Sequence, residues 1–427
     1  MMLEARFILN TDILNIRLSM TTHPLGFLTT ASRKLLLCTA LACTSLLANA
    51  QSDTPATAAG AQPTHVVAVS ELSTIPVPEV PAKAWLTLDA NSGQVIGALN
   101  PTQQVEPASL TKLMAAYVVF DAIKNGRLSL DQQVTISEKA WRTEGSRMFV
   151  EVNSQVSVDD LLKGVIVQSG NDATVALAEA VAGSEGAFVA LMNEEAKRQG
   201  LADTHYTNSP GLPDPQHMTT VRDLATLATN LVTDFPEFLH YYSQKEFTYN
   251  KIKQPNRNRL LWADGTVDGL KTGHTSSAGY CLVSTAVRDG RRVISVLVGA
   301  DSEAARTEAS LKLLNWSYQN FDTIKLFDKD QPAVQARVWE GEAETVDLGQ
   351  TKPIWLTVPR GKGPDVQPIA HYTQPLIAPL TKGSEVGTVS LSLDGKILRE
   401  EPLAVMNDVA QAGFFGRLYD KVRLMLQ

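Results

Sequence analysis

Strand-like segments lie on both sides of a long helical stretch, and this order constrains the fold more than any other feature of the sequence. The apolar runs 84–88 and 94–98 are separated by turn residues, which predicts a β-hairpin. Apolar residues then recur at steps of three and four through most of 109–232, as in amphipathic helices. A second hairpin is predicted within 279–299, where an Asp-Gly pair divides two β-rich runs. We therefore expect a mixed α/β (α+β) domain whose sheet takes strands from both of its ends.

The character of the sequence changes after Phe327. Short β-like runs follow, separated by glycine, proline and charged residues, at 333–339, 344–348, 354–358, 386–393 and 396–401. This pattern predicts a small all-β domain at 328–404, distinct from the larger domain at 82–325. The smaller domain holds no candidate nucleophile with a partner, so we expect it to act as a spacer or scaffold.

Residues 1–50 have the layout of a secretory signal peptide. The basic pair Arg33 and Lys34 precedes the apolar run 35–47, and small residues follow where a signal peptidase would cleave. The apolar run is too short for a comfortable transmembrane helix. Nothing before Met20 is needed for such a signal, so we expect translation to start there.

The segment that follows the signal peptide, 51–81, is rich in Ala, Thr, Pro and Ser and is predicted to be a flexible linker. Beyond the signal only Cys281 remains, which excludes an intramolecular disulfide and a thiolate metal cluster. The histidines have no metal-ligand spacing, so neither a metal nor another cofactor is expected. The net charge of −7 argues against nucleic acid as a partner, because phosphate binding needs a basic face.

Three short motifs that could carry chemistry occur in a fixed order. They are S-x-x-K at Ser109 and Lys112, S-x-N at Ser169 and Asn171, and K-T-G beginning at Lys271. The first two each arise by chance on the order of once in a chain of this length, so neither is informative alone. Together, and in predicted helix-start, helix-joint and strand contexts, they indicate a serine acyl-transfer site.

Ser109 lies at the predicted start of a helix, and Lys112 follows three residues later on the same face. The free backbone N–H groups of a helix N-terminus favour anionic character at the serine oxygen. A lysine becomes a base only when desolvation or a nearby cation lowers its pKa, and Lys271 is the candidate cation. The K-T-G motif is expected to open a strand, where its glycine would let a substrate backbone approach closely.

The three motifs match the penicillin-recognising serine hydrolases. Four segments resemble the membrane-associated D-alanyl-D-alanine carboxypeptidases: 106–114 (EPASLTKLM), 168–173 (QSGNDA), 256–262 (NRNRLLW) and 267–275 (VDGLKTGHT). The resemblance runs from about residue 84 to the C-terminus. It implies a penicillin-binding fold, with an antiparallel sheet and a helical subdomain, followed by an all-β domain. It also implies removal of the terminal D-alanine from peptidoglycan stem peptides through an acyl-enzyme, and binding of β-lactams.

The resemblance assigns catalytic roles to residues of the first two motifs. Ser109 would be the acylated nucleophile and Lys112 its general base. Ser169 and Asn171 would relay a proton and hold the substrate amide.

The resemblance places substrate-binding residues at the third motif. Lys271 would set the electrostatics and, with Thr272, bind the terminal carboxylate, while Gly273 would allow close approach. The backbone N–H of His274, with that of the nucleophile, would form the oxyanion hole, and its side chain would be structural or line the substrate. Arg306 would either support carboxylate recognition or form a plain surface salt bridge.

Other functions on the same scaffold remain open at this point. A class A β-lactamase would need an E-x-x-L-N segment between Asn171 and Lys271, and none of the glutamates there begins one. A DD-endopeptidase would use the same chemistry on a cross-linked substrate. A catalytically inactive cell-wall-binding protein would not need the intact Ser109 and Lys112 pair.

The C-terminal segment 410–427 is predicted to be an amphipathic helix that lies on a membrane. At 100° per residue the apolar side chains other than Leu424 share one face: Phe414, Phe415, Leu418, Tyr419, Val422, Met425 and Leu426. Arg417, Lys421 and Arg423 outweigh Asp420 on the opposite face, which suits anionic lipid. The alternative is a helix packed on the β domain. We expect an exported protein, held at the periplasmic face of the inner membrane, which could also form a homodimer.

Overall fold

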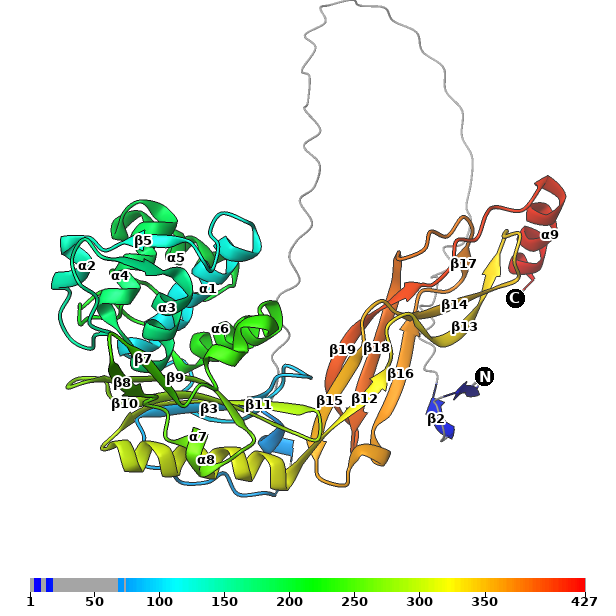
Figure 1. The fold of residues 1–427 in the computed structure, drawn as a ribbon. Coiled ribbons are helices and arrows are strands. Elements are labelled where there is room, and N and C mark those ends of the chain that lie inside the picture. Colours follow the sequence, from blue (N-terminus) through cyan, green and yellow to red (C-terminus); the bar gives the residue numbers. More distant parts are fainter. Residues whose placement is uncertain (1–3, 9–12, 18–67, 73, 427) are drawn as a thin grey trace, which may run out of the picture.

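The computed structural model describes residues 4–8, 13–17, 68–72 and 74–426 (Figure 1). Its first elements, β1 (Glu4–Ile8) and β2 (Ile13–Arg17), pair antiparallel. The basic and apolar parts of the predicted signal peptide, and most of the predicted linker, lie outside the described residues.

A five-stranded antiparallel sheet forms the floor of the first domain, in the order β4-β3-β11-β10-β9. Its strands are β3 (Ala84–Asp89), β4 (Val95–Leu99), β9 (Val267–Thr275), β10 (Gly279–Arg288) and β11 (Arg291–Ala300). The predicted hairpins are β3-β4 and β10-β11, and β3 pairs with β11 across the length of the domain, Leu88 opposite Ile294. The expected sheet with strands from both ends is therefore confirmed.

Helices cover both faces of this sheet. On one face lies α8 (Glu303–Asn320), and on the other lies α6 (Val221–Asp234) beneath the helical subdomain (Figure 1). Both helices begin at a hydroxyl cap, Ser302 and Thr220, whose side chain accepts the backbone N–H three residues on. The caps fix where the two helices start. The apolar faces of the helices then cover the sheet.

The helical subdomain packs around one almost fully buried helix, α1 (Lys112–Lys124). Around it lie α2 (Glu138–Arg142), α3 (Val158–Lys163), α4 (Asn171–Ala182), α5 (Glu185–Arg198) and the small pair β5 (Gln133–Thr135) and β6 (Gln155–Ser157). Ser157 caps α3, because its Oγ accepts the backbone N–H of Asp160 at 3.1 Å. The subdomain thus packs above the sheet, and the candidate site lies at the boundary between the subdomain and the sheet.

Shorter elements complete the first domain. They are η1 (Val69–Leu72), η2 (Ala108–Thr111), the π-helical turn η3 (Gly164–Gln168), η4 (Pro236–Tyr241), β7 (Glu246–Tyr249), β8 (Ile252–Pro255) and α7 (Leu260–Ala263). The elements η2, η3 and β8 border the candidate site.

The last part of the predicted flexible linker is packed against the first domain, so that prediction is wrong there. Val69 is fully buried. The indole Nε1 of Trp316 donates to the carbonyl of Pro76 at 3.1 Å, and Lys312 Nζ donates to the carbonyl of Glu79 at 2.9 Å. The segment is rich in proline and its apolar residues have no regular spacing, so the sequence pattern did not predict that it packs. Those residues find partners only in the folded domain.

The second domain is all-β, as expected. A six-stranded sheet has the order β16-β18-β19-β14-β13-β17, and β12 pairs separately with β15. The strands are β12 (Phe321–Phe327), β13 (Gln331–Trp339), β14 (Thr345–Gln350), β15 (Ile354–Pro359), β16 (Gln367–Tyr372), β17 (Leu376–Ile377), β18 (Glu385–Leu393) and β19 (Lys396–Val405), with η5 (Gly363–Asp365) between β15 and β16. Because β12 pairs with β15, this domain begins at Phe321, ahead of the predicted boundary.

A buried polar network joins the two domains. The carboxylate of Asp89 accepts from Arg291 Nε and from Thr323 Oγ1, both at 2.6 Å. The backbone N–H of Thr357 donates to Gln94 Oε1 at 2.6 Å. These bonds cross from the β3-β4 turn to β12 and β15, so the β domain is held in a fixed place beside the first domain (Figure 1).

Candidate active site

Ser109 lies in the η2 turn that leads directly into α1, and Lys112 is the first residue of that helix. The Lys112 side chain is buried, with its Nζ 3.1 Å from Ser109 Oγ. The same nitrogen donates to Asn171 Oδ1 and to the carbonyl of Pro210, each at 2.7 Å. The structure thus brings the first two motifs together around one amine.

A neutral histidine, His217, forms a hydrogen bond to the η2 turn that carries Ser109. His217 Nδ1 accepts the backbone N–H of Thr207 at 3.1 Å, so the ring proton is on Nε2, which bonds Thr111 Oγ1 at 2.8 Å. Burial lowers the pKa of His217 to about 4, so the ring is uncharged at neutral pH. Sequence spacing gave no sign of this contact, because the two segments are distant in the chain.

Ser169 follows the π-helical turn η3 and has a left-handed backbone, with φ of 67°. Its Oγ is buried and has no hydrogen-bond partner among the described residues. Strained backbone and unpaired buried polar atoms are concentrated at functional sites, where a substrate supplies the missing partner. Ser169 therefore presents a free hydroxyl to the cleft.

The K-T-G motif lies in the second half of β9, and not at the start of a strand as predicted. Lys271 and Thr272 are buried, and His274 is exposed at the rim. A Cβ added to Gly273 would lie 3.2 Å from the carbonyl of Pro107. A side chain there would push β9 away from the nucleophile turn, which accounts for the glycine.

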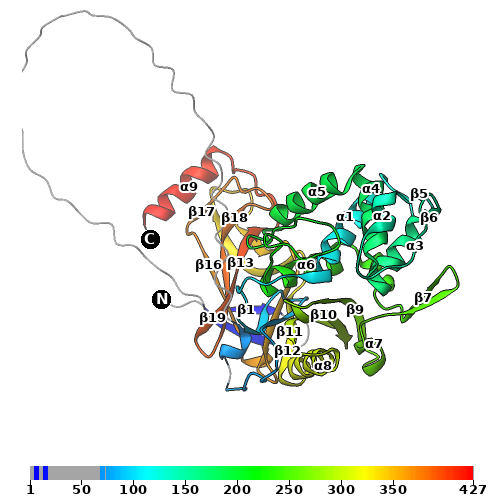
Figure 2. The same ribbon diagram turned by 90° about the vertical axis from the view of Figure 1, so that its left-hand side faces the viewer.

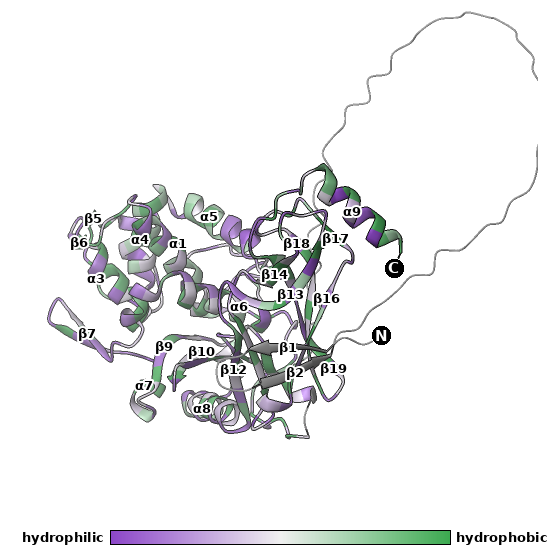
Figure 3. Cartoon of the chain, turned by 90° about the vertical axis from the view of Figure 1, so that its right-hand side faces the viewer, coloured by the Kyte–Doolittle hydropathy of each residue, from purple (hydrophilic) through white to green (hydrophobic). Residues whose placement is uncertain are grey.

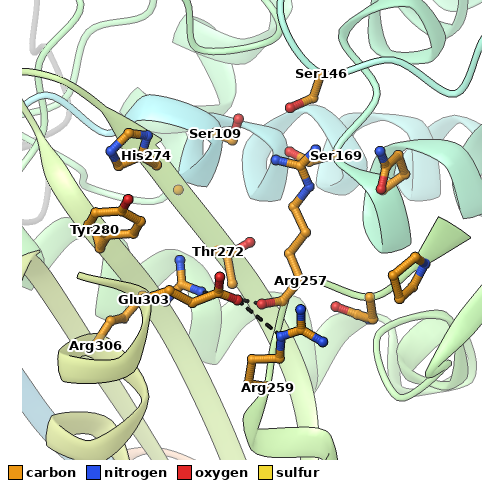
Figure 4. A pocket seen from close by; sticks show the side chains of 14 residues that line it. Ser109, Ser146, Ser169, Arg257, Arg259, Thr272, His274, Tyr280, Glu303 and Arg306 are labelled. Carbon is orange, nitrogen blue, oxygen red and sulfur yellow. Dashed lines mark hydrogen bonds and ion pairs between the residues drawn. The ribbon is translucent and has the colours of Figure 1, made fainter.

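A cleft of about 480 Å³ lies where these elements meet. Its walls are Ser109, Ser146, Gln168, Ser169, Pro255, Asn256, Arg257, Arg259, Thr272, Gly273, His274, Tyr280, Glu303 and Arg306. Figure 4 shows the three serines on one side of the cleft, opposite Arg259, Glu303 and Arg306. The aromatic ring of Tyr280 packs on the imidazole of His274, with centroids 4.1 Å apart.

Arg306 is buried in the cleft wall, so the expectation of a plain surface salt bridge is wrong. Only 4% of the residue is exposed, and its Nη2 donates to the carbonyl of Arg257 at 3.3 Å. It also lies 3.5 Å from the Glu303 carboxylate. Its buried Nε has no partner among the described residues. The guanidinium therefore keeps an unpaired N–H beside its contacts with Arg257 and Glu303.

Burial, and after it the positive charge of the cleft, lowers the pKa of both lysines. Burial is the main cause for Lys112, followed by the charge of Arg257, and its pKa falls to about 7. Burial also lowers the pKa of Lys271 well below its ordinary value, helped by Lys112, Arg257 and Arg306. The site therefore combines a neutral amine with positive charge suited to a carboxylate.

Sequence reasoning missed several residues of the cleft. Ser146 and Tyr280 lie outside every motif, and only the fold brings them to the site. Arg257 and Arg259 stood in a segment already noted for its resemblance, and two arginines there were the signal that could have found them. Throughout 4–8, 13–17, 68–72 and 74–426, no group of His, Cys, Asp or Glu could hold a metal ion.

Comparison with known proteins extends the match over both domains. Residues 71–302 match the family model of the D-alanyl-D-alanine carboxypeptidases, peptidase S11, and residues 321–411 match that of the C-terminal domain of penicillin-binding protein 5. D-alanyl-D-alanine carboxypeptidase DacC of Escherichia coli is 44% identical over 359 residues, which are 82% of this chain and 90% of that protein. DacA of Haemophilus influenzae is 45% identical over 352 residues, 80% of this chain and 89% of that protein.

Solved structures agree. Penicillin-binding protein 5 from Haemophilus influenzae has a TM-score of 0.77 at 44% identity, covering 79% of this chain and all of that one. Penicillin-binding protein D2 from Listeria monocytogenes, solved with ampicillin bound, has a TM-score of 0.53 at 30% identity and covers 57% of this chain and 100% of its own. Fold and cleft thus define a serine hydrolase of the penicillin-binding class. The chain belongs to the peptidase S11 family, the D-alanyl-D-alanine carboxypeptidases that act on peptidoglycan.

Proposed function

We propose that Ser109 is the acylated nucleophile and Lys112 its general base in removing the terminal D-alanine from pentapeptide stems. The contacts of Lys112 Nζ carry this proposal. Asn171 Oδ1 and the Pro210 carbonyl can only accept, so they take up the two N–H bonds of a neutral amine. The remaining lone pair then faces the hydroxyl of Ser109, 3.1 Å away.

The reaction follows from this arrangement. Lys112 takes the hydroxyl proton as Ser109 Oγ bonds to the carbonyl carbon of the penultimate D-alanine. The C–N bond then breaks, and the leaving D-alanine nitrogen receives the proton that Lys112 took up, relayed through the free hydroxyl of Ser169, so that Lys112 is neutral again. Water next attacks the ester, giving the shortened peptide and restoring Ser109. The backbone N–H groups of Ser109 and His274 would stabilise the oxyanion.

Substrate recognition is assigned to the cationic side of the cleft. A peptide ending in D-alanine carries a carboxylate, which matches the buried guanidinium of Arg306 and the adjacent Thr272 and Lys271. A β-lactam also carries a carboxylate beside its reactive amide, so it would occupy the same positions.

The experiment that tests this function compares two substrates. A peptide ending in D-Ala-D-Ala should release free D-alanine, and a cross-linked dimer of stem peptides should be cleaved much more slowly. The D-alanyl-D-alanine endopeptidase of Escherichia coli is a weaker match, 28% identical over 60% of this chain and 83% of that protein. Faster cleavage of the dimer would favour the endopeptidase alternative, and rapid turnover of penicillin would favour a β-lactamase.

Acylation by penicillin is expected to depend on pH through Lys112. The amine must be neutral to accept a proton, and its pKa is lowered to about 7. The second-order acylation rate should therefore rise about tenfold per pH unit below that value and level off above it. Stopped-flow measurement between about pH 5 and about pH 9 checks this. An acylation rate that does not change with pH over this range, or that is still rising tenfold per unit at its upper end, would contradict a base with the lowered pKa of Lys112.

We also propose that the protein is exported and held at the periplasmic face of the inner membrane by α9 (Phe414–Met425). This helix lies at the end of the β domain away from the first domain (Figures 1 and 2). Its apolar residues are exposed, with Phe415 at 82% and Met425 at 86%. Figure 3 shows hydrophobic and hydrophilic residues interleaved along the helix.

The polar face of α9 contacts the β domain. The backbone N–H of Glu340 donates to Asp420 Oδ2 at 2.7 Å, and Lys421 Nζ lies 3.8 Å from the Glu340 carboxylate. These contacts leave Phe414, Phe415, Leu418 and Val422 turned outward, as an interfacial helix requires. In the part of the chain that the structure describes, no single helix is long and apolar enough to span a membrane, and only α4 and α5 together, bent by 83°, pass that test.

Deleting 413–427 is expected to release the protein from anionic vesicles without loss of activity on a soluble peptide. Phe414→Glu with Phe415→Glu should do the same, because buried apolar surface supplies most of the affinity. High salt should weaken binding only in part. Ile397→Glu is the matched control, since Ile397 is 58% exposed on the same domain but lies outside α9. Vesicle co-sedimentation measures the effect, and a truncated protein that still sediments would contradict the proposal.

A further inference from the structure

Asp172 is a buried carboxylate next to the S-x-N motif, and the roles assigned so far do not use it. Only 1% of the residue is exposed. Its Oδ1 accepts the backbone N–H groups of Met148 and Ala173, both at 2.9 Å. Its Oδ2 accepts those of Phe149 at 2.9 Å and Val150 at 3.3 Å. No ion pair with Asp172 occurs within the described residues, so backbone amides alone compensate its charge.

Three of the four amides that Asp172 accepts, those of Met148, Phe149 and Val150, belong to the loop 143–150, which also bonds to Asn171. Asn171 Nδ2 donates to the carbonyl of Glu144 at 2.6 Å, and Asn171 N donates to the carbonyl of Ser146 at 2.7 Å. The first bond fixes the amide so that Oδ1 faces Lys112 Nζ. The loop also places Ser146 in the cleft wall.

We propose that Asp172 is a positioning residue for acyl transfer. Its carboxylate holds the loop 143–150 against α4, and the loop in turn holds the Asn171 amide on the Lys112 amine. The inference rests on the proposed roles of Ser109 and Lys112. A loop free to shift by about 1 Å would misdirect the Lys112 lone pair, and misplacement of that size can cost about 10²-fold in rate.

The charge of Asp172 also acts on the base. The charge of Arg257 lowers the pKa of Lys112 and the charge of Asp172 raises it, while the neighbouring Lys271 has its own pKa lowered well below the ordinary value. His217 is also near but uncharged. Removing the charge of Asp172 leaves the charge of Arg257 unopposed, so the pKa of Lys112 falls further. The acid limb of the pH profile then moves to lower pH.

Asp172→Asn is expected to lower the penicillin acylation rate by about 10²-fold, because the new NH₂ group faces backbone N–H donors that it cannot accept. The acid limb should move to lower pH in the same variant. A merely structural role would reduce the fraction of folded protein and leave that limb in place. Asp89→Asn is the control outside the cleft: it also removes a buried carboxylate that accepts backbone N–H groups, here one paired with Arg291, and folded protein should keep both rate and limb.

Gly145→Ala tests the same link without touching the buried carboxylate. Gly145 is exposed, with φ of 89°, and an added Cβ would lie 2.6 Å from Asn171 Nδ2. This variant should fold with some loss of stability, because alanine is strained at a positive φ, and it should lose acylation rate and keep its pH limb. Normal acylation in Gly145→Ala, or an unshifted limb in folded Asp172→Asn, would overturn the inference. Failure of the proposed function is distinguishable, because only then would Ser109→Ala still be labelled by penicillin.

Discussion

Ser109→Ala is expected to abolish both D-alanine release and covalent labelling by penicillin. No other hydroxyl in the described cleft lies within hydrogen-bond distance of Lys112 Nζ. Loss of a serine nucleophile in comparable hydrolases costs on the order of 10⁶-fold in turnover. The measurements are free D-alanine from a peptide ending in D-Ala-D-Ala, and protein mass after incubation with penicillin.

Ser169→Ala is the control for this variant. Its hydroxyl is proposed to relay a proton and not to form the ester, so labelling should persist at a reduced rate. The assignment of the nucleophile would fail if Ser109→Ala still formed an adduct, or if Ser169→Ala lost the adduct entirely.

Lys112→Arg is expected to lower acylation by about 10² to 10⁴-fold, the range for losing a general base. Arginine keeps the positive charge but does not lose its proton near neutral pH. The pocket around Lys112 Nζ is also closed by Ser109, Asn171 and Pro210, which leaves little room for a guanidinium. The acylation rate with a labelled penicillin measures the effect, and thermal unfolding checks that the variant is folded.

Lys163→Arg serves as the control for that substitution. Lys163 forms an ion pair with Asp159 at 2.5 Å on the helical subdomain, outside the cleft, so the change should be neutral. Near-normal acylation in Lys112→Arg would show that the lysine acts only as a charge.

The sequence predicted the sheet because its hairpins are local and carry strong turn signals. It did not predict β16 (Gln367–Tyr372), whose inward residues include Pro368 and Ala370 and therefore lack the β-branched pattern of a strand. The start of the β domain was placed too late for a related reason. Residues 321–327 have no partner near them in the chain, and only pairing with β15 makes them a strand of that domain.

Some residues of the candidate site could likewise be predicted from the sequence and others could not. The residues of the three motifs could be predicted because each motif is a short segment with its own helix or strand context. Ser146 and Tyr280 could not, because their approach to Ser109 depends on how separate segments pack. Arg306 shows the difference most clearly: its charge is visible in the sequence, but its 4% exposure is decided by α8 packing on the sheet.

The measurement that tests the central claim most directly is mass spectrometry of the wild-type protein treated with penicillin and then digested. Ring opening joins the drug to the protein without loss of a fragment, so the adduct should have the full mass of the penicillin. It should map to the peptide containing Ser109. Incubation with excess D-Ala-D-Ala peptide before penicillin should reduce the adduct, since both use one cleft. An adduct on any other residue, or no adduct in folded protein, would contradict the account.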